Sequence, residues 1–274
     1  MKLTGPSMSE KLREALKNAS DGKLLVHCWR GGMRSKAMAW LFSLGGIDTI
    51  LLEGGYKAYR HHVLDSLSEN RKSIILGGMT GRSKTHILKF LKENGQQVID
   101  LEGIANHKGS AFGALGQEPQ PTTEQFSNLL YDEWKRLDSE KPVWLEDESR
   151  SIGSVFMPEH FFLNMQEEKT IVLMMAPEIR LPRLMKEYSV YPPELLKASV
   201  MKISKRLGGD NTRDALESID NGDIAKAILI SLNYYDKAYQ FSIKKKNNSE
   251  IIYVETDTDD IETNAKKILE AAGL

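Results

Sequence analysis

The sequence predicts an α/β fold, because short apolar segments alternate along the chain with longer segments whose apolar residues recur at helical spacing. Two of the apolar segments, 23–28 and 73–78, run directly into loops that contain paired glycines. Of the 274 residues, 41% are apolar and 27% are charged, which are the proportions of a soluble globular protein. This length suits one large domain or two smaller ones.

A first series of elements fills the N-terminal part of the chain. Residues 8–19 are expected to form a helix, and KLLVHC at 23–28 a buried strand. A helix at 34–44 and a short strand at 49–53 follow. A glycine turn then leads into a helix that ends near Asn70.

A second series begins at once with the strand SIILGG at 73–78, followed by a helix at 83–95 that ends at a glycine. The later elements are strands at 96–103, 169–176 and 250–256, and a strand that runs into an acidic turn within 142–149. The expected helices lie at 122–137, over most of 177 to about 243, and at the end of the chain. We place the boundary between the two series near residues 69–72. The expected domains are therefore residues 1–70 and 71–274.

Several classes of protein are excluded by composition. One cysteine excludes a disulfide framework and a cysteine-based zinc cluster, and the six histidines show no metal spacing, so no structural metal is expected. The first 23 residues lack the apolar core of a signal peptide. The longest apolar runs are far shorter than the roughly 20 residues that span a bilayer. A cytoplasmic protein without a membrane partner is expected.

The net charge of −1 means that a nucleic-acid partner must meet a local basic patch. Candidate clusters are Arg180, Arg183 and Lys186; Lys202, Lys205 and Arg206; and Lys244 to Lys246. Tyrosines that could stack on unpaired bases are Tyr188, Tyr191, Tyr234 and Tyr235. Because such patterns are also common on solvated or packed helices, the RNA-contacting residues stay open.

The single cysteine, Cys28, lies in the stretch HCWRGGMRS at 27–35. The preceding strand delivers its thiol to a turn whose backbone N–H groups can surround one point, and a helix begins near Arg34. These groups, with Arg30 and Arg34, are expected to lower the pKa of the thiol and to stabilise a nucleophilic thiolate. The sequence therefore predicts a catalytic loop that contains Cys28, Arg30 and Arg34.

Two other interpretations of this stretch stay open. A free cysteine is often a small buried hydrophobe. The residues also satisfy the pattern HCxxGxxR[ST] of cysteine phosphatases, which need a carboxylic acid from a separate loop. No acid is singled out for that role, and the phosphatase pattern explains nothing after residue 60.

A second site is predicted at GGMTGRSKT, residues 77–85, which follows a strand and opens a helix as a phosphate-binding P-loop does. Its glycines let the backbone approach an anion, Lys84 adds charge, and Thr85 can reach a magnesium ion. The strict pattern has glycine where this chain has Ser83, whose Cβ would stand between backbone and phosphate. The expected phosphate-binding residues are Gly78, Thr80, Gly81, Ser83, Lys84 and Thr85.

Two further stretches accompany this loop. VWLEDESR at 143–150 places Glu146, Asp147 and Glu148 at a strand end, where a P-loop fold holds a carboxylate that positions magnesium or water. HKGSAFG at 107–113 is by itself a glycine–serine loop with one histidine, which an ordinary connection would also explain.

In series, the motifs resemble those of the tRNA 2-selenouridine synthase family. They are HCWRGGMRS, EGGYKAYR (53–60), GGMTGRSKT, LEG (101–103), HKGSAFG and LEDESRSIG (145–153), and RLPRLMKEY near residue 188 resembles a further family stretch. The resemblance begins at about residue 24 and continues more weakly to the end. It implies the C-terminal part of a rhodanese-like α/β domain in residues 1–70. It also implies a P-loop NTPase-like, three-layer α/β domain with a helical C-terminal part in residues 71–274.

The resemblance also implies a reaction, the conversion of 2-thiouridine at the wobble position of tRNA into 2-selenouridine. A geranyl group from geranyl diphosphate alkylates the sulfur, and selenium from selenophosphate then replaces the geranylated sulfur. In this scheme Cys28 handles selenium, the P-loop holds the diphosphate, and His107, Lys108 and Ser110 line the prenyl-diphosphate or tRNA site. Mg²⁺ is an expected cofactor, and the tRNA anticodon stem–loop and a selenophosphate supplier are expected partners.

Members of this family have a longer rhodanese-like segment before the cysteine strand, whereas 27 residues precede Cys28 here. A separate chain that completes this domain is therefore an expected partner, and geranylation is the step expected to persist. Two alternatives remain: a nucleotide-dependent, kinase-like P-loop protein, and an inactive tRNA-binding remnant.

Overall fold

The computed structural model describes residues 5–81, 83–246 and 250–274. The chain divides into two units, Met1–Ser66 and Leu67–Leu274, and the division falls inside helix α3 (Gly55–Ser68). The sequence placed this boundary a few residues later, between 70 and 71. Each unit is described separately below.

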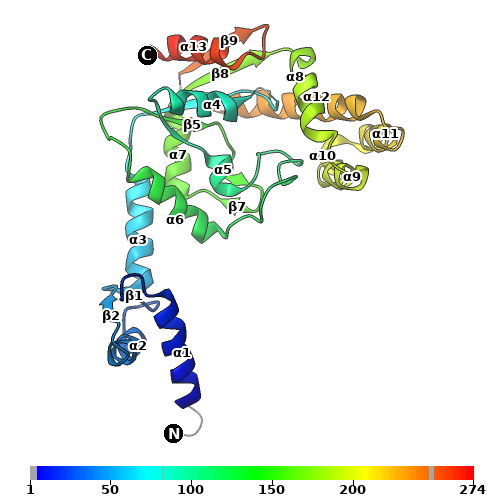
Figure 1. Cartoon of the computed structure of the whole chain (residues 1–274). Coiled ribbons are helices and arrows are strands. Elements are labelled where there is room, and N and C mark those ends of the chain that lie inside the picture. The colour runs from blue at the N-terminus through cyan, green and yellow to red at the C-terminus, as the bar shows by residue number, and fades with distance from the viewer. Residues whose placement is uncertain (1–4, 82, 247–249) are drawn as a thin grey trace. The chain divides into compact units, whose positions relative to one another are not determined.

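The first unit contains a pair of parallel strands with helices around it (Figure 1). In chain order it comprises α1 (Gly5–Asn18), β1 (Lys23–Val26), α2 (Met33–Leu44), β2 (Asp48–Leu51) and most of α3. The strands pair in register from Lys23 with Asp48 to Val26 with Leu51. The core is small, consisting of Ala15, Val26, Ala39, Phe42 and Ile47 with a few partly buried neighbours. Two strands alone cover little apolar surface, and Leu25 and Ile50 remain more than half exposed.

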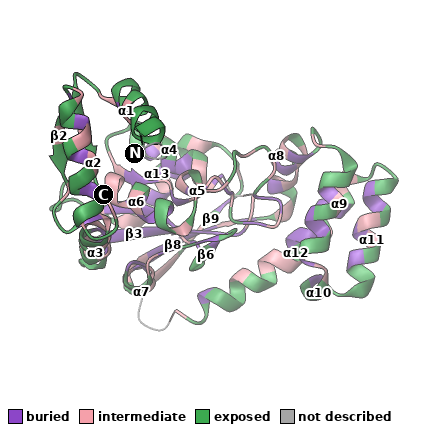
Figure 2. Cartoon of the chain, turned by 90° about the horizontal axis from the view of Figure 1, so that it is seen from below, coloured by how far each residue is buried: buried purple, intermediate pink, exposed green. Residues whose placement is uncertain are grey.

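The second unit is built on a five-stranded parallel sheet in the order β4-β5-β3-β8-β9. The strands are β3 (Ser73–Gly77), β4 (Gln97–Ile99), β5 (Val143–Glu146), β8 (Lys169–Met175) and β9 (Ile251–Thr256). Every residue of the central strand β3 is buried, as the unbroken apolar run SIIL predicts for a strand covered on both faces (Figure 2). The loops at the carboxyl ends of β3 and β5 therefore lie next to each other, where open α/β sheets bind ligands.

Helices complete the sheet layer. Helix α4 (Lys84–Glu93) and helix α13 (Ile261–Ala272) share one apolar core with β3 and β8, which includes Ile87, Leu91, Leu76, Ile171 and Ile268. The other helices of this part are α5 (Leu101–Ala105), α6 (Thr123–Trp134) and α7 (Glu159–Glu167), and a short hairpin of β6 (Ser151–Ile152) and β7 (Val155–Phe156) precedes α7. Trp134 of α6 meets Phe161 of α7 edge to face at 5.3 Å.

A helical part lies beyond one end of the sheet in Figure 1. It consists of α8 (Pro177–Tyr188), α9 (Pro193–Lys202), α10 (Ser204–Leu207), α11 (Gly209–Asp220) and α12 (Ile224–Ile243). These helices bury their own apolar cluster, which includes Leu184, Val200, Ala215, Ile219 and Leu232. Among the described residues, no helix is both long and apolar enough to cross a membrane.

The parallel sheet with its C-terminal helices confirms the predicted α/β class. The expected strand at 96–103 was wrong in its second half, because β4 ends at Ile99. The side chain of Asp100 accepts a hydrogen bond from the N–H of Gly103 and caps α5, so LEG begins a helix. Short-range capping therefore overrides the apolar pattern of this segment.

Candidate active site

The loop after β1 places hydrogen-bond donors around the sulfur of Cys28. The Sγ atom lies 3.4 Å from Oγ of the buried Ser35, which itself donates to the carbonyl of Gly32 at 3.0 Å. The Ser35 hydroxyl, followed by the backbone N–H groups of Ser35, Gly32 and Arg30, lowers the pKa of Cys28 from 9.0 to about 6. The thiol is therefore a nucleophilic thiolate near neutral pH.

The two arginines of this loop behave differently from the expectation. Arg30 and Arg34 are exposed, and their charges are not among the causes that lower the pKa of Cys28. The sequence predicted that backbone N–H groups lower the pKa of the thiol. It also assigned part of this effect to the arginine charges, whereas the hydroxyl of Ser35 is the largest cause. Both guanidinium groups are free to face an incoming anion.

A glycine pair from the motif EGGYKAYR supports the cysteine loop. Gly55 has a φ of +64°, and a Cβ there would collide with the N of Gly31 and the carbonyl of Cys28. The backbone of Tyr56 donates to that same carbonyl at 3.0 Å. Glycine is therefore required at position 55 both by its conformation and by the close approach of two chain segments.

The loop between β3 and α4, called the phosphate loop below after its sequence motif, turns at residues with positive φ. Gly78 and Gly81 have φ values of +144° and +83°, and Ser83 adopts the left-handed conformation with a φ of +60°. Ser83 is thus strained where the strict pattern has glycine, and its buried Oγ has no hydrogen-bond partner. The ammonium group of Lys84 donates to the carbonyl of Gly78 at 3.0 Å, across the mouth of the loop. Arg82 lies outside the described residues.

Two carboxylates lie beside this loop. Oγ1 of Thr85 donates to Oε2 of Glu102 at 3.1 Å, and Glu102 is hydrogen-bonded to Glu148. Burial is the main cause that raises the pKa of both groups, and it raises that of Glu148 to about 8, while the charge of Lys84 acts in the opposite direction. Glu102 was not among the predicted site residues. The LEG stretch that contains it was the available signal.

The three consecutive acids at the end of β5 have three different surroundings. Glu146 is completely buried and accepts from the N–H groups of Leu101 and Glu102 at 2.7 and 3.2 Å, which fixes the start of α5. Asp147 forms a buried ion pair with Lys246 at 2.6 Å. Glu148 alone pairs with Glu102 next to Lys84. The prediction treated the three as one group, whereas the structure gives each of them different partners.

The loop at 107–113 lies against the carboxylate pair. A Cβ at Gly109 would come within 3.0 Å of the side chains of Glu102 and Glu148, so glycine permits this contact. His107 is 8% exposed, and its Nδ1 has no hydrogen-bond partner. Burial, with a smaller contribution from Lys202, lowers the pKa of His107, which keeps the ring neutral. The buried Nδ1 lies against Gly113, because a Cβ at that glycine would come within 2.9 Å of it.

The other two predicted residues of this loop have protein partners. Lys108 forms an ion pair with Glu187 at 2.5 Å. Ser110 accepts the N–H of Phe112 at 3.2 Å and is hydrogen-bonded to Tyr188. Lys108 therefore connects the loop to Glu187 of α8. Ser110 bonds within the loop and also connects it to Tyr188 of α8.

Several predicted RNA-contacting residues are buried or paired. Arg180 is 1% exposed and forms a bidentate ion pair with Asp236, so this candidate does not lie on an exposed basic face. Arg183 pairs with Asp259, and Lys246 pairs with Asp147. The members that remain exposed are Lys186, Lys202, Lys205, Arg206, Lys244 and Lys245.

The tyrosine candidates are also largely engaged in packing. Tyr188 is buried, and the hydroxyl of Tyr235 accepts the N–H of Ala111 at 2.7 Å.

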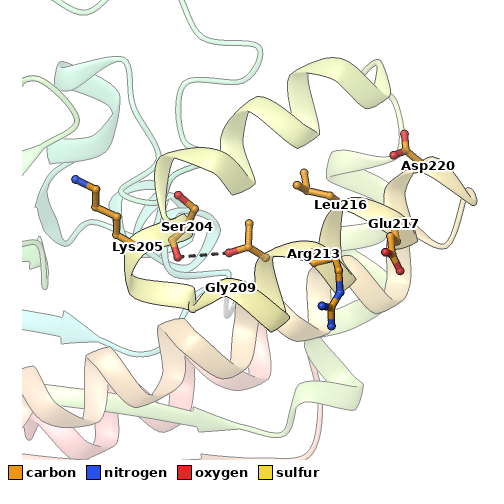
Figure 3. A pocket seen from close by; sticks show the side chains of 8 residues that line it. Ser204, Lys205, Gly209, Arg213, Leu216, Glu217 and Asp220 are labelled. Carbon is orange, nitrogen blue, oxygen red and sulfur yellow. Dashed lines mark hydrogen bonds between the residues drawn. The ribbon is translucent and has the colours of Figure 1, made fainter.

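Lys205 and Arg213 line a shallow groove on α10 and α11 (Figure 3). Among the described residues, no group of three or more histidine, cysteine or acidic side chains is arranged to hold a metal ion.

Comparisons with known proteins match most of the chain to a family. The family model of the tRNA 2-selenouridine synthase AAA domain matches residues 71–271, a range that contains the phosphate loop and the carboxylate pair but not Cys28. The tRNA 2-selenouridine synthase of Shewanella piezotolerans is 38% identical over 255 residues, which are 81% of this chain and 68% of that protein. The one from a Sulfurovum species is 34% identical over 270 residues, or 86% of this chain and 72% of that protein.

Solved structures with a detectable likeness are more distant. Shikimate kinase from Bacteroides thetaiotaomicron is 18% identical with a TM-score of 0.36, over 74% of this chain and 99% of that chain. A tRNA isopentenylpyrophosphate transferase from Bacillus halodurans is 11% identical with a TM-score of 0.39, over 74% of this chain and 96% of that chain.

Proposed function

The chain belongs to the tRNA 2-selenouridine synthase family, and from this premise we propose that it converts wobble 2-thiouridine of tRNA into 2-selenouridine in two steps. Geranyl diphosphate first alkylates the sulfur, and selenium from selenophosphate then replaces the geranylated sulfur. The observation that supports this proposal most is the phosphate loop with Lys84 beside the buried pair Glu102 and Glu148. This arrangement lies wholly within the matched range 71–271.

The first step needs a site that stabilises a leaving diphosphate. The sulfur of 2-thiouridine bonds to C1 of the geranyl group, the C1–O bond breaks, and its electron pair leaves with the diphosphate while the base loses its N3 proton. Backbone N–H groups at the start of α4, the positive end of that helix and Lys84 oppose this charge. Because no phosphoryl group is transferred, the cradle only has to hold the diphosphate, and Ser83 in place of glycine is compatible with that task.

Mg²⁺ is the proposed cofactor of this step. The residues present fit such an ion, because Thr85, Glu102 and Glu148 offer oxygen ligands, and the two buried carboxyl groups need a positive charge or a proton between them. When bound, the ion would supply positive charge to the diphosphate oxygens. Thr85 and the two carboxylates would then hold it beside the loop.

The second step is assigned to the cysteine loop. The selenium of selenophosphate bonds to C2 of the uracil ring, the C2–S bond breaks, and geranylthiol leaves with the proton of the selenol, which is easier than expelling sulfur from a carbon–sulfur double bond. Water then breaks the P–Se bond, so that inorganic phosphate leaves and N3 regains its proton. We assign the handling of selenophosphate to Cys28, because its low pKa and the surrounding N–H groups suit an anionic chalcogen. The exposed Arg30 and Arg34 would meet the phosphate oxygens.

The proposal includes partners for the first unit. A selenophosphate-supplying protein would deliver the selenium donor in the cytoplasm. A separate chain that completes the rhodanese-like domain would cover strand residues such as Leu25 and Ile50, which are 56% and 55% exposed.

Mass spectrometry of a 2-thiouridine-containing anticodon stem–loop tests the two steps. The protein is incubated with geranyl diphosphate and Mg²⁺, and selenophosphate is added afterwards. We expect the geranyl mass in wild type and Cys28→Ala but not in Lys84→Ala, and the selenouridine mass only where Cys28 is intact. Lys92→Ala is the matched control, because Lys92 lies on the same helix and is 58% exposed.

Other outcomes distinguish the alternatives. Hydrolysis of ATP or GTP that depends on Lys84, without any geranyl mass, would replace the proposal with a nucleotide-dependent P-loop enzyme. A folded protein that binds the stem–loop but leaves its mass unchanged would be a tRNA-binding module. Geranylation without selenation would limit the activity of this chain to the first step.

A further inference from the structure

A tyrosine from the far end of the sequence contacts the first residues of the phosphate loop. The backbone N–H of Gly78 donates to the hydroxyl oxygen of Tyr239, on α12, at 2.9 Å. The same hydroxyl donates to Oδ2 of Asp147 at 2.9 Å. Tyr239 therefore connects the phosphate loop to the end of β5 through one oxygen atom.

Behind this tyrosine lies a buried ion pair. The ammonium group of Lys246 donates to Oδ1 of Asp147 at 2.6 Å and to Oγ1 of Thr170 at 3.2 Å. The side chains of Lys246 and Asp147 are only 4% and 7% exposed. With one carboxylate oxygen engaged by Lys246 and the other by Tyr239, Asp147 is a support for the loop and not a ligand in the cradle.

The same helix acts on the loop a second time, through an arginine of α8. Asp236, three residues before Tyr239, holds the buried guanidinium of Arg180, and Arg180 donates to the carbonyl of Thr80 at 3.0 Å. Helix α12 thus holds Gly78 directly, by the N–H of that glycine, and Thr80 indirectly, through Arg180 of α8. A segment with glycines at 77, 78 and 81 has many alternative conformations, so contacts from outside are needed to hold it in one of them.

We propose that Tyr239 is a positioning residue for the phosphate loop, with Asp147 and Lys246 holding its hydroxyl in place. This inference rests on the proposed function in one respect, namely that the loop binds a diphosphate. The space at Gly77 supports the same contact, because a Cβ at that position would collide with the hydroxyl oxygen of Tyr239. Tyr239 and Gly77 therefore form a matched pair, in which the absent side chain makes room for the hydroxyl.

The first test measures the hydrogen bond itself. Hydrogen exchange of the Gly78 amide is compared in wild type and in Tyr239→Phe, which removes only the hydroxyl. We expect exchange at least tenfold faster in the variant while the amides of β8 exchange as before. Tyr253→Phe is the matched control, because Tyr253 is 56% exposed on β9. Equal exchange of Gly78 in all three proteins would overturn the proposal.

The second test measures binding of inorganic pyrophosphate and of geranyl diphosphate by calorimetry. In Tyr239→Phe we expect Kd values for both to rise about tenfold, the effect of one lost hydrogen bond, with an unchanged melting temperature to within a few degrees. In turnover, KM for geranyl diphosphate should rise by more than kcat falls. A wild-type protein that binds neither probe would contradict the proposed function, while the exchange experiment would still decide the role of Tyr239.

A double-mutant cycle tests the steric pairing. Gly77→Ala should abolish pyrophosphate binding in the wild-type background, and the additional change Tyr239→Phe should recover part of it, because the collision is removed. If Gly77→Ala is equally damaging in both backgrounds, the hydroxyl does not determine the conformation of the loop and the proposal fails.

Discussion

The sulfur of Cys28 lies 3.4 Å from the hydroxyl oxygen of Ser35, and this contact is the largest single cause of the lowered thiol pKa. Replacing Ser35 with alanine removes a donor to the thiolate, so the pKa of Cys28 should rise from about 6 toward 9. At pH 7 about 90% of the wild-type thiol is ionised, since the pH lies one unit above a pKa of about 6.

The pH dependence of iodoacetamide labelling at Cys28 measures this change. The midpoint for Ser35→Ala should move to higher pH by at least one unit, and labelling at pH 7 should slow severalfold. Ser43→Ala is the control, because Ser43 is on the same helix α2 but bonds to Ala39 and Thr49. An unchanged midpoint in Ser35→Ala would show that backbone N–H groups alone stabilise the thiolate.

The raised pKa of Glu148 predicts that the stability of the second unit depends on pH. Its pKa rises from 4.5 in an unfolded chain to about 8 in the folded protein, so the folded state holds a proton that the unfolded state has lost between these values. Stability therefore falls as pH rises from about 4.5 to about 8 and then levels off. Glu148→Gln removes this cost, and its melting temperature should exceed that of wild type by an amount that grows over the same range.

Thermal unfolding in EDTA between pH 5 and 9 checks this expectation, because a bound cation would replace the proton. Glu140→Gln, at an exposed position, is the control and should follow the wild-type curve. If Glu148→Gln is less stable than wild type at pH 8, the carboxylate is held by favourable charges in the folded protein and the sign of the shift is wrong.

The ion pair between Arg180 and Asp236 predicts a large loss of stability when one partner is removed. Arg180 is 1% exposed and also donates to Thr80, so Arg180→Met leaves Asp236 partly buried without its partner. Removing one member of such a pair costs about 3–5 kcal/mol. Arg183→Met, on the same helix but in a more exposed pair with Asp259, should cost less than about 1 kcal/mol.

Urea unfolding of these variants gives the comparison. The double variant Arg180→Met with Asp236→Leu should lose less than the sum of the single changes, because no charge is left alone. Equal losses for Arg180→Met and Arg183→Met would mean that burial does not strengthen the first pair.

Much of this architecture is visible in the sequence because its signals are local. An apolar run followed by glycines predicts β3 and its loop, and Lys84 and Thr85 follow in the same few residues. The partners that complete the site are distant along the chain: Tyr239 is 161 residues from Gly78, and Lys246 is 99 residues from Asp147. No periodicity or spacing in the sequence connects such pairs, so only the folded structure reveals them.

The same reason explains the errors at charged positions. Arg180 and Lys246 have the residue types and spacing of a solvated basic face, but each is buried against an aspartate that the sequence does not place nearby. Glu146, Asp147 and Glu148 are adjacent in sequence, whereas alternate side chains at a strand end point in different directions. Their adjacency in the sequence therefore predicted one shared role, whereas in the structure the three acids have different partners.

The basic residues that remain exposed next to the site give a prediction for RNA binding. The charge of Lys202 contributes to the lowered pKa of His107, and that of Arg206 opposes the burial that raises the pKa of Tyr235 to about 12. Both cations are therefore near the loop at 107–113, whereas Arg213 lines the groove on α11 (Figure 3). Arg213 also forms ion pairs with Asp210 and Asp214.

Lys202→Glu and Arg206→Glu should each weaken binding of the anticodon stem–loop about tenfold and reduce the dependence of log Kd on log salt by about one. Arg213→Glu, with the same change of charge, should weaken it less than about twofold, because two aspartates already offset this arginine. Fluorescence anisotropy between 50 and 200 mM salt separates these effects. If all three variants lose affinity equally, the RNA responds to the net charge of the helical part and does not approach the loop at 107–113 along Lys202 and Arg206.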